Sequence, residues 1–194
     1  MHVATADFLA GMRRLAAGVA IITTRHGDVR AGLTATSLCS LTAEPPRLLA
    51  CIHRRADAHD LILSSRRFAV NLLGPGQQAL ADHFGGRDDS HGPGRFGLGL
   101  WIAGSSGMPV LADAAAVLEC RLVDAVPTGT HSIMIGEVDT VRDDVTLKEE
   151  IVGRHVISME FAKSTVCQIK MLARLDALRV DYGLRLETQV YCRN

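Results

Sequence analysis

The sequence lacks a charge imbalance, a long apolar run and a leader-like start. Its 194 residues carry 21 Lys and Arg against 21 Asp and Glu, so no net charge attracts the chain to nucleic acid or to an anionic membrane. No segment approaches the roughly 18 consecutive apolar residues of a membrane-spanning helix. Residues 1–10 have neither the cationic start nor the apolar stretch of a signal peptide. We therefore expect a cytoplasmic protein that binds neither nucleic acid nor a membrane.

Metal-binding spacings are also missing. The five cysteines are scattered and form no Cys-x-x-Cys pair, which favours reduced packing thiols over a disulfide framework or a zinc site. None of the eight histidines forms His-x-x-x-His or pairs with a cysteine at zinc spacing. We expect no metal.

What the sequence has is a series of short apolar and β-branched runs. With 47% apolar residues, the chain is long enough for one sizeable core. Short helices are expected at residues 5–17, 57–64 and 77–84, the first lying on a sheet. The helices fall at loop ends rather than at regular crossovers, so the pattern favours a mainly β fold, an antiparallel barrel or Greek key, over a doubly wound sheet. At least six strands are expected, at residues 19–24, from 29 on, 47–53, 68–73, 116–126 and 132–142.

Residues 32–46 form the most informative run, because hydroxyls and small side chains alternate in it. Gly32 and Ala35 keep bulk away, so backbone N–H groups and hydroxyls can both reach a planar or phosphorylated ligand. Pro45 and Pro46 fix the exit of the run. The composition alone fits a ligand-binding loop and a polar surface loop equally well. The hydroxyls belong to Thr34, Thr36, Ser37, Ser40 and Thr42.

Several further sequence motifs follow in a fixed order. Residues 68–73 read Phe-Ala-Val-Asn-Leu-Leu, residues 118–120 read Leu-Glu-Cys, and residues 129–138 read Gly-Thr-His-Ser-Ile-Met-Ile-Gly-Glu-Val. Together with the Gly-x-Thr-Ala-x-Ser-x-x-Ser-x-Thr-x-x-Pro-Pro run, this order resembles the flavin reductase-like family, whose fold is the FMN-binding split barrel. The resemblance covers roughly residues 8–141, and no single motif in it is specific by itself.

The resemblance implies a split β-barrel with short helices and an NAD(P)H:flavin oxidoreductase. Such an enzyme reduces free FMN or FAD, takes its hydride from NADH or NADPH, and supplies reduced flavin to a partner monooxygenase. A homodimer is also implied. The alternative is a non-catalytic or repurposed split-barrel protein that binds a cofactor or a partner.

The resemblance also assigns roles to individual residues. Hydride passes directly from the nicotinamide to the flavin, so the part of the protein is orientation. Two other interpretations stay open: Arg54 and Arg55 also fit a solvated turn, and His131 also fits a residue that caps the start of a strand. The implied residues are Thr34, Ala35, Thr36 and Ser37 for the isoalloxazine, Ser40, His53, Arg54 and His59 near the phosphate, Phe84 close to the flavin, and His131 for the nicotinamide.

Three features depart from the family pattern. Ala56 stands where a serine is usual, and Thr130 replaces an aspartate next to His131. The chain also continues for about fifty residues after the expected barrel. We therefore expect a barrel domain at residues 1–143 and an atypical helix and strand extension at residues 144–194, packed on the barrel or on a dimer partner.

Overall fold

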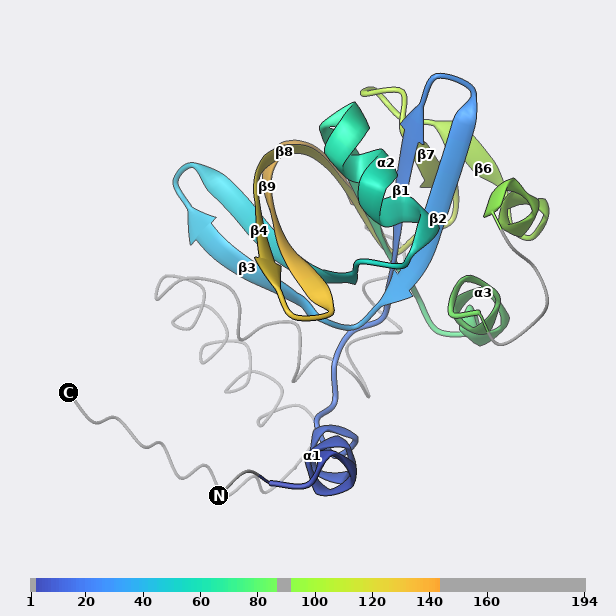
Figure 1. Ribbon diagram of the computed structural model, residues 1–194. Coiled ribbons are helices and arrows are strands. Elements are labelled where there is room, and N and C mark those ends of the chain that lie inside the picture. The colour runs from blue at the N-terminus through green and yellow to red at the C-terminus, as the bar shows by residue number, and fades with distance from the viewer. Residues whose placement is uncertain (1–2, 87–91, 144–194) are drawn as a thin grey trace, which may run out of the picture. The chain divides into compact units, whose positions relative to one another are not determined.

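The structure is a computed structural model that describes residues 3–86 and 92–143. The predicted extension at residues 144–194 lies outside the described residues. Within them the chain forms three α-helices, one 3-10 helix and nine strands (Figure 1). In chain order these are α1 (Thr5–Met12), β1 (Ala20–His26), β2 (Val29–Ala35), β3 (Leu38–Ala43), β4 (Pro46–His53), α2 (Asp57–Ser65), β5 (Arg67–Leu72), α3 (Gln78–Phe84), η1 (Gly92–Gly97), β6 (Trp101–Ala103), β7 (Pro109–Leu111), β8 (Ala116–Thr128) and β9 (His131–Asp143).

Seven strands form one antiparallel sheet in the order β2-β1-β5-β8-β9-β4-β3. Its two edge strands, β2 and β3, are consecutive in the chain and are separated only by Thr36 and Ser37. Two residues span about 10 Å at most, so the sheet must curl until its edges approach each other. We call this meeting of the two edges, at Thr36 and Ser37, the seam. The strands β8, β9 and β4 curve accordingly in Figure 1, and β2 contacts β4. The predicted antiparallel split barrel is confirmed.

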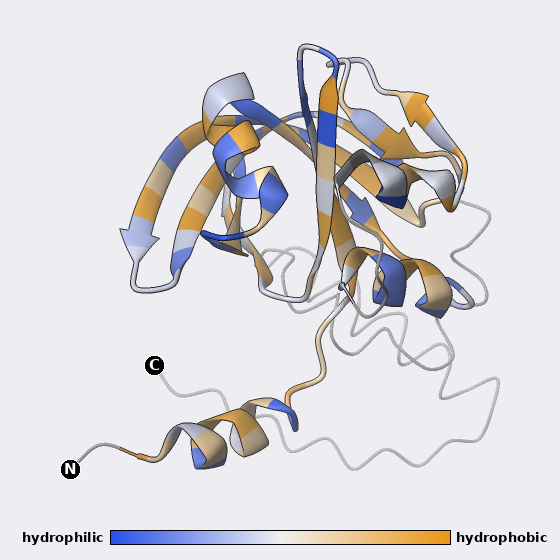
Figure 2. Ribbon diagram, turned by 45° about the vertical axis from the view of Figure 1, so that its right-hand side comes forward, coloured by the Kyte–Doolittle hydropathy of each residue, from blue (hydrophilic) through white to orange (hydrophobic). Residues whose placement is uncertain are grey.

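Alternation along the strands builds the barrel core. In β4 the side chains of Leu48, Ala50 and Ile52 are buried, while the residues between them are only partly covered. Figure 2 shows the same alternation as orange segments separated by paler ones along the strands. A period of two puts every second side chain on the inner face.

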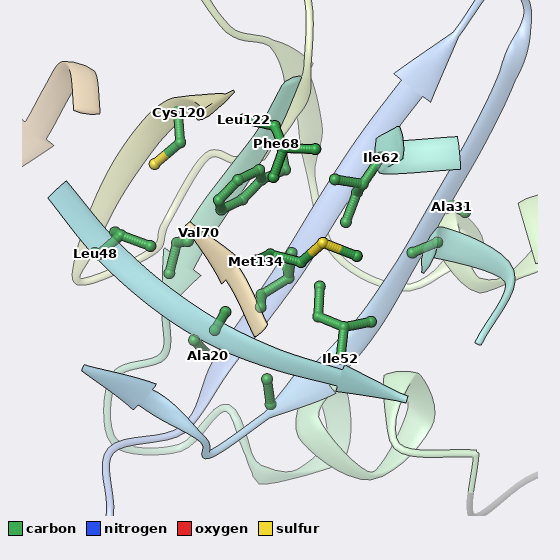
Figure 3. Packing of buried hydrophobic residues seen from close by; sticks show 14 residues of the cluster. Ala20, Ala31, Leu48, Ile52, Ile62, Phe68, Val70, Cys120, Leu122 and Met134 are labelled. Atoms are coloured by element: carbon green, nitrogen blue, oxygen red, sulfur yellow. The ribbon is translucent and has the colours of Figure 1, made fainter. Parts of the chain in front are cut away.

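The helix α2 closes this core. It contacts β1, β2, β5 and β8, and it lies between the β1–β2 hairpin and the curved β8–β9 pair in Figure 1. Ile62 of α2 points into the same cluster as Phe68 and Met134 (Figure 3). Burying each of these side chains contributes about 1.5–3 kcal/mol.

Three aromatic residues, Phe84, Phe96 and Trp101, gather in a second cluster. The rings of Phe84 and Phe96 meet edge to face with centroids 5.3 Å apart, and Trp101 lies 5.2 Å from Phe84. Gly32 of β2 makes room for this cluster, because a Cβ there would lie 2.8 Å from Cε1 of Phe84. The glycine that begins the 32–46 run is thus required by the packing of α3.

Two sequence predictions need correction. The first helix ends at Met12 rather than at residue 17, and it buries no residue against a sheet: Phe8 is 55% exposed and Leu15 67%. The run at 32–46 is mostly strand, not loop. Thr34 and Thr42 are β-branched and suit the pleated backbone of β2 and β3, and only Thr36 and Ser37 connect these two strands.

Glu119 ties the turn between β6 and β7 to the barrel. Its carboxylate is buried and accepts hydrogen bonds from the backbone N–H of Ser105 (2.9 Å) and of Ser106 (2.7 Å), and from both serine hydroxyls. Burial alone raises the pKa of this carboxyl, but the bonds from Ser106 and Ser105 outweigh burial and lower the pKa below its ordinary value.

A lowered pKa predicts acid-sensitive stability. Glu119 contributes its full stabilisation above the unfolded-state pKa of about 4.3, and the contribution is lost as the pH falls through the lower folded-state value. In Glu119→Gln the free energy of unfolding should be reduced at pH 7, and the difference from wild type should shrink below about pH 4. Urea unfolding at both pH values measures this. A difference that is the same at both values contradicts the account, and exposed Glu44→Gln controls for loss of a charge.

Candidate functional site

The seam brings the centre of the 32–46 run to one end of the barrel. Thr34 donates its hydroxyl hydrogen to the carbonyl of Ala81 at 2.7 Å, which fixes the end of β2 to α3. Ala35 buries its methyl group in the core, so it offers a ligand only its backbone. Thr36 and Ser37 are exposed, and the carbonyl of Ser37 accepts the N–H of Cys51 at 3.0 Å. Hydroxyls and backbone groups therefore face solvent where the sheet edges meet.

A pocket of about 330 Å³ opens beside this end of β2. Two arginine side chains, Arg55 and Arg95, face it, with Asp57 as the one acidic residue of its lining. Arg95 also donates from Nη1 to the carbonyl of Gly32 at 3.2 Å, which anchors it to β2. Two cationic side chains and one acidic side chain thus belong to the lining. Its lining consists of Leu33, Thr34, Arg55, Ala56, Asp57, Phe84, Gly85 and Arg95.

The first turn of α2 forms one wall of the pocket. Ala56 is the N-cap residue, with the extended backbone (φ −72°, ψ 136°) that suits a capping side chain. Its methyl group cannot accept a hydrogen bond, and within the described residues no other side chain caps this helix. The first N–H groups of α2 and the positive end of its dipole therefore face the pocket beside Arg55, an arrangement that binds anions such as phosphate.

Two imidazoles meet at the neighbouring strand ends. His53 ends β4 and His131 begins β9, the two residues are directly opposite each other in the ladder, and their rings pack edge to face with centroids 4.9 Å apart. The N–H of Arg55 donates to Nδ1 of His53 at 3.0 Å, so a neutral His53 carries its proton on Nε2. The Thr130 hydroxyl lies 2.9 Å from Nδ1 of His131. Thr130 thus orients the imidazole without adding a negative charge.

His59 occupies a different environment from the other predicted residues. It is 5% exposed, and its two ring nitrogens lie 2.6 Å from Oδ1 of Asp60 and 2.9 Å from Oγ of Ser132. Both nitrogens are already bonded within the protein. The structure gives His59 no direct path to a ligand in the pocket.

The predicted site residues thus divide into groups. Thr34 and Phe84 line the pocket, although Phe84 is only 1% exposed. His53 and His131 pair beside it, and the N–H of Arg54 donates to the carbonyl of Thr130 at 2.9 Å. Ser40 is exposed on β3 opposite Leu48, away from the pocket lining.

Six of the eight lining residues lie outside the predicted set, and two of these six, Arg55 and Arg95, are cationic. Arg55 adjoins Arg54, and the sequence could not say which of the two arginines turns inward. Arg95 lies in the glycine-rich connection after α3, where no periodicity places a side chain. Its position directly before the apolar Phe96 was the one available signal.

Neither a metal cluster nor a membrane span appears in the described part of the chain. Residues 3–86 and 92–143 contain no group of three or more His, Cys, Asp or Glu side chains that could hold a metal ion. None of the helices in these ranges has the length and hydropathy needed to cross a membrane.

Comparison with known proteins yields consistent matches. The family described as Flavin reductase like domain matches residues 12–170, and so runs past Asp143 into the segment that the sequence analysis sets apart. The chain is 44% identical to "FMN reductase (NADH) RutF" of Pseudomonas syringae over 135 residues, which is 70% of this chain and 75% of the relative.

Solved structures that resemble this chain also include flavin reductases. The NADH:FAD oxidoreductase SgcE6 of Streptomyces globisporus is 31% identical with a TM-score of 0.66, over 75% of this chain and 89% of that one. A second structure of SgcE6 is a complex with NAD and FAD fragments. BorF, the flavin reductase component of a bacterial two-component tryptophan halogenase, is 31% identical with a TM-score of 0.65, over 72% and 88% of the two chains.

The uncapped helix α2 generates a stability prediction. Ala56→Ser places a hydroxyl where the N-cap backbone is already extended, so the free energy of unfolding should rise by about 1 kcal/mol. Urea unfolding measures it, with Ala56→Val as the control that adds bulk but no acceptor. Equal effects of serine and valine would show that the first turn of α2 has no uncapped N–H group to satisfy.

Proposed function

Since the chain belongs to the flavin reductase-like family, we propose that it transfers hydride from a reduced nicotinamide cofactor to a free flavin. The observation that carries the proposal is the convergence of three elements on one pocket: Leu33 and Thr34 of β2, the uncapped start of α2, and Arg95. A flavin mononucleotide needs one planar surface with hydrogen-bonding groups along an edge and one anion site. In this proposal the exposed Thr36 and Ser37 serve the edge of the ring, and the pocket with Arg55 and Arg95 serves the anion.

The phosphate fits the pocket chemically. Arg55 and Arg95 provide guanidinium donors, and the first N–H groups of α2 provide neutral donors in the same place. Charge-assisted hydrogen bonds of this kind are about twice as strong as neutral ones. We assign the phosphate to Arg55 and to the start of α2, with Arg54 holding the β9 end through Thr130.

The isoalloxazine and the nicotinamide then belong to the seam and the histidine pair. The backbone of Ala35 and the hydroxyls of Thr36 and Ser37 can bond the polar edge of the ring, while Thr34 holds β2 to α3. His131, oriented by Thr130 and by the ring of His53, places the nicotinamide. The flavin supplies the electron-accepting ring when bound. What the protein supplies is orientation.

The relatives support a more specific assignment. The Pseudomonas syringae relative is named an FMN reductase that uses NADH, so we propose FMN as acceptor and NADH as donor. BorF serves a two-component halogenase, and we propose that this chain likewise supplies reduced flavin to a separate oxygenase, such as a monooxygenase. We further propose that it works in the cytoplasm as a homodimer.

One assay tests the activity. Purified protein is mixed with FMN or FAD and with NADH or NADPH, and oxidation of the nicotinamide is followed by its absorbance. We expect turnover, fastest with NADH and FMN. If none of the four pairs reacts, the reductase proposal falls. Flavin binding without turnover would then favour a repurposed cofactor-binding protein, and faster turnover with FAD or NADPH would reverse the assigned preference.

His131 offers a narrower prediction. Because its role is to place the nicotinamide, His131→Ala should raise the KM for NADH by about tenfold or more, while the Kd for FMN changes less than about twofold. Steady-state kinetics and flavin fluorescence titration measure the two constants. A larger effect on FMN than on NADH would remove His131 from the nicotinamide side.

A further inference from the structure

The backbone on either side of His131 is held by two bonds from the segment around the start of α2. On one side, the carbonyl of Thr130 accepts the N–H of Arg54. On the other side, the Ser132 hydroxyl bonds to Nε2 of His59, which lies in the first turn of α2. The first strand residue of β9 is thus fixed at both neighbours.

The second of these bonds belongs to a chain of three groups. Asp60, His59 and Ser132 are linked by contacts of 2.6 Å and 2.9 Å. A carboxylate only accepts, so Nδ1 of His59 carries a proton toward Asp60, and in the neutral ring Nε2 accepts the proton of the Ser132 hydroxyl. The Asp60 side chain is 89% exposed, whereas His59 and Ser132 are buried. Asp60 therefore sets the tautomer from the surface, and the bond between His59 and Ser132 lies in the interior.

These three groups follow the order of a hydrolytic triad, but a substrate cannot reach the serine. Ser132 is 4% exposed and is absent from the pocket lining, so its hydroxyl presents no nucleophile to a substrate. These three groups can therefore only hold neighbouring parts of the protein in place.

Strand alternation gives this buried bond a consequence for the site. Successive side chains of a strand point to opposite faces, so Ser132 pointing inward requires His131 to point outward. The burial pattern of β9 agrees, with Ser132 buried and His131 partly exposed. The strength of the inward bond therefore limits how far the His131 ring can move.

We propose that His59 is a positioning residue that fixes the His131 imidazole by bonding Ser132 inside the barrel. This inference rests on the proposed role of His131 toward the nicotinamide. It also replaces the sequence-based expectation that His59 contacts the flavin phosphate.

Kinetics of matched variants test the proposal. His59→Asn keeps an amide near Asp60 but is too short for Ser132, whereas the longer amide of His59→Gln reaches the Nε2 position. We expect His59→Asn and Ser132→Ala to raise the KM for NADH about tenfold. In both variants kcat and the Kd for FMN should stay within about twofold of wild type. In His59→Gln the KM for NADH should return most of the way to the wild-type value. Ser64→Ala removes an exposed hydroxyl from the same helix and serves as the control.

The double variant separates positioning from general destabilisation. If His59 acts through His131, then adding His59→Asn to His131→Ala leaves the KM for NADH unchanged. An additive increase overturns the proposal. A lowered melting temperature in His59→Asn and Ser132→Ala with an unaltered KM overturns it as well.

A measurement without turnover keeps the inference distinct from the proposed activity. Histidine ring signals in NMR spectra, with that of His131 assigned by its loss in His131→Ala, should shift in His59→Asn and Ser132→Ala and stay near the wild-type position in His59→Gln. Unshifted His131 signals refute the positioning role even in an active enzyme. Shifted signals in a protein that oxidises no nicotinamide would support the positioning role and refute the activity.

Discussion

The two-residue connection between the edge strands is the constraint on which the rest of the structure depends. Because only Thr36 and Ser37 separate β2 from β3, the sheet cannot stay open, and its closure creates the core that holds Phe68 and Met134. Just before the connection, Leu33 and Thr34 of β2 line a pocket together with the start of α2. Closure of the barrel thus follows from one short piece of backbone.

Two residues depart from the family pattern: Ala56 stands in place of a serine, and Thr130 stands in place of an aspartate. Ala56 leaves the start of α2 uncapped, which makes its N–H groups available beside Arg55. Thr130 orients His131 through a hydroxyl and adds no charge. In the proposed site, anion binding would therefore depend on arginine and backbone donors, and nicotinamide placement would depend on packing and hydrogen bonds.

The sequence predicted the strands whose alternation or β-branched content is strong, such as β1, β4, β8 and β9. The sequence did not predict features whose position is set by tertiary contacts. The threonines of the 32–46 run suit a strand as well as a loop, and only the seam distinguishes the two. Arg95 was missed because its place is set by bonds to Gly32 and Phe84, which are distant in sequence. His59 was predicted near a phosphate, but its partner Ser132 lies 73 positions away.

The central claim, that the seam and the start of α2 together hold the flavin, is tested most directly by amide hydrogen exchange with and without FMN. The account predicts that added protection concentrates in residues 34–37, whose N–H groups would bond the ring edge, and in residues 57 and 58, whose N–H groups would bond the phosphate. Protection that leaves both segments unchanged and appears elsewhere in the barrel would contradict it.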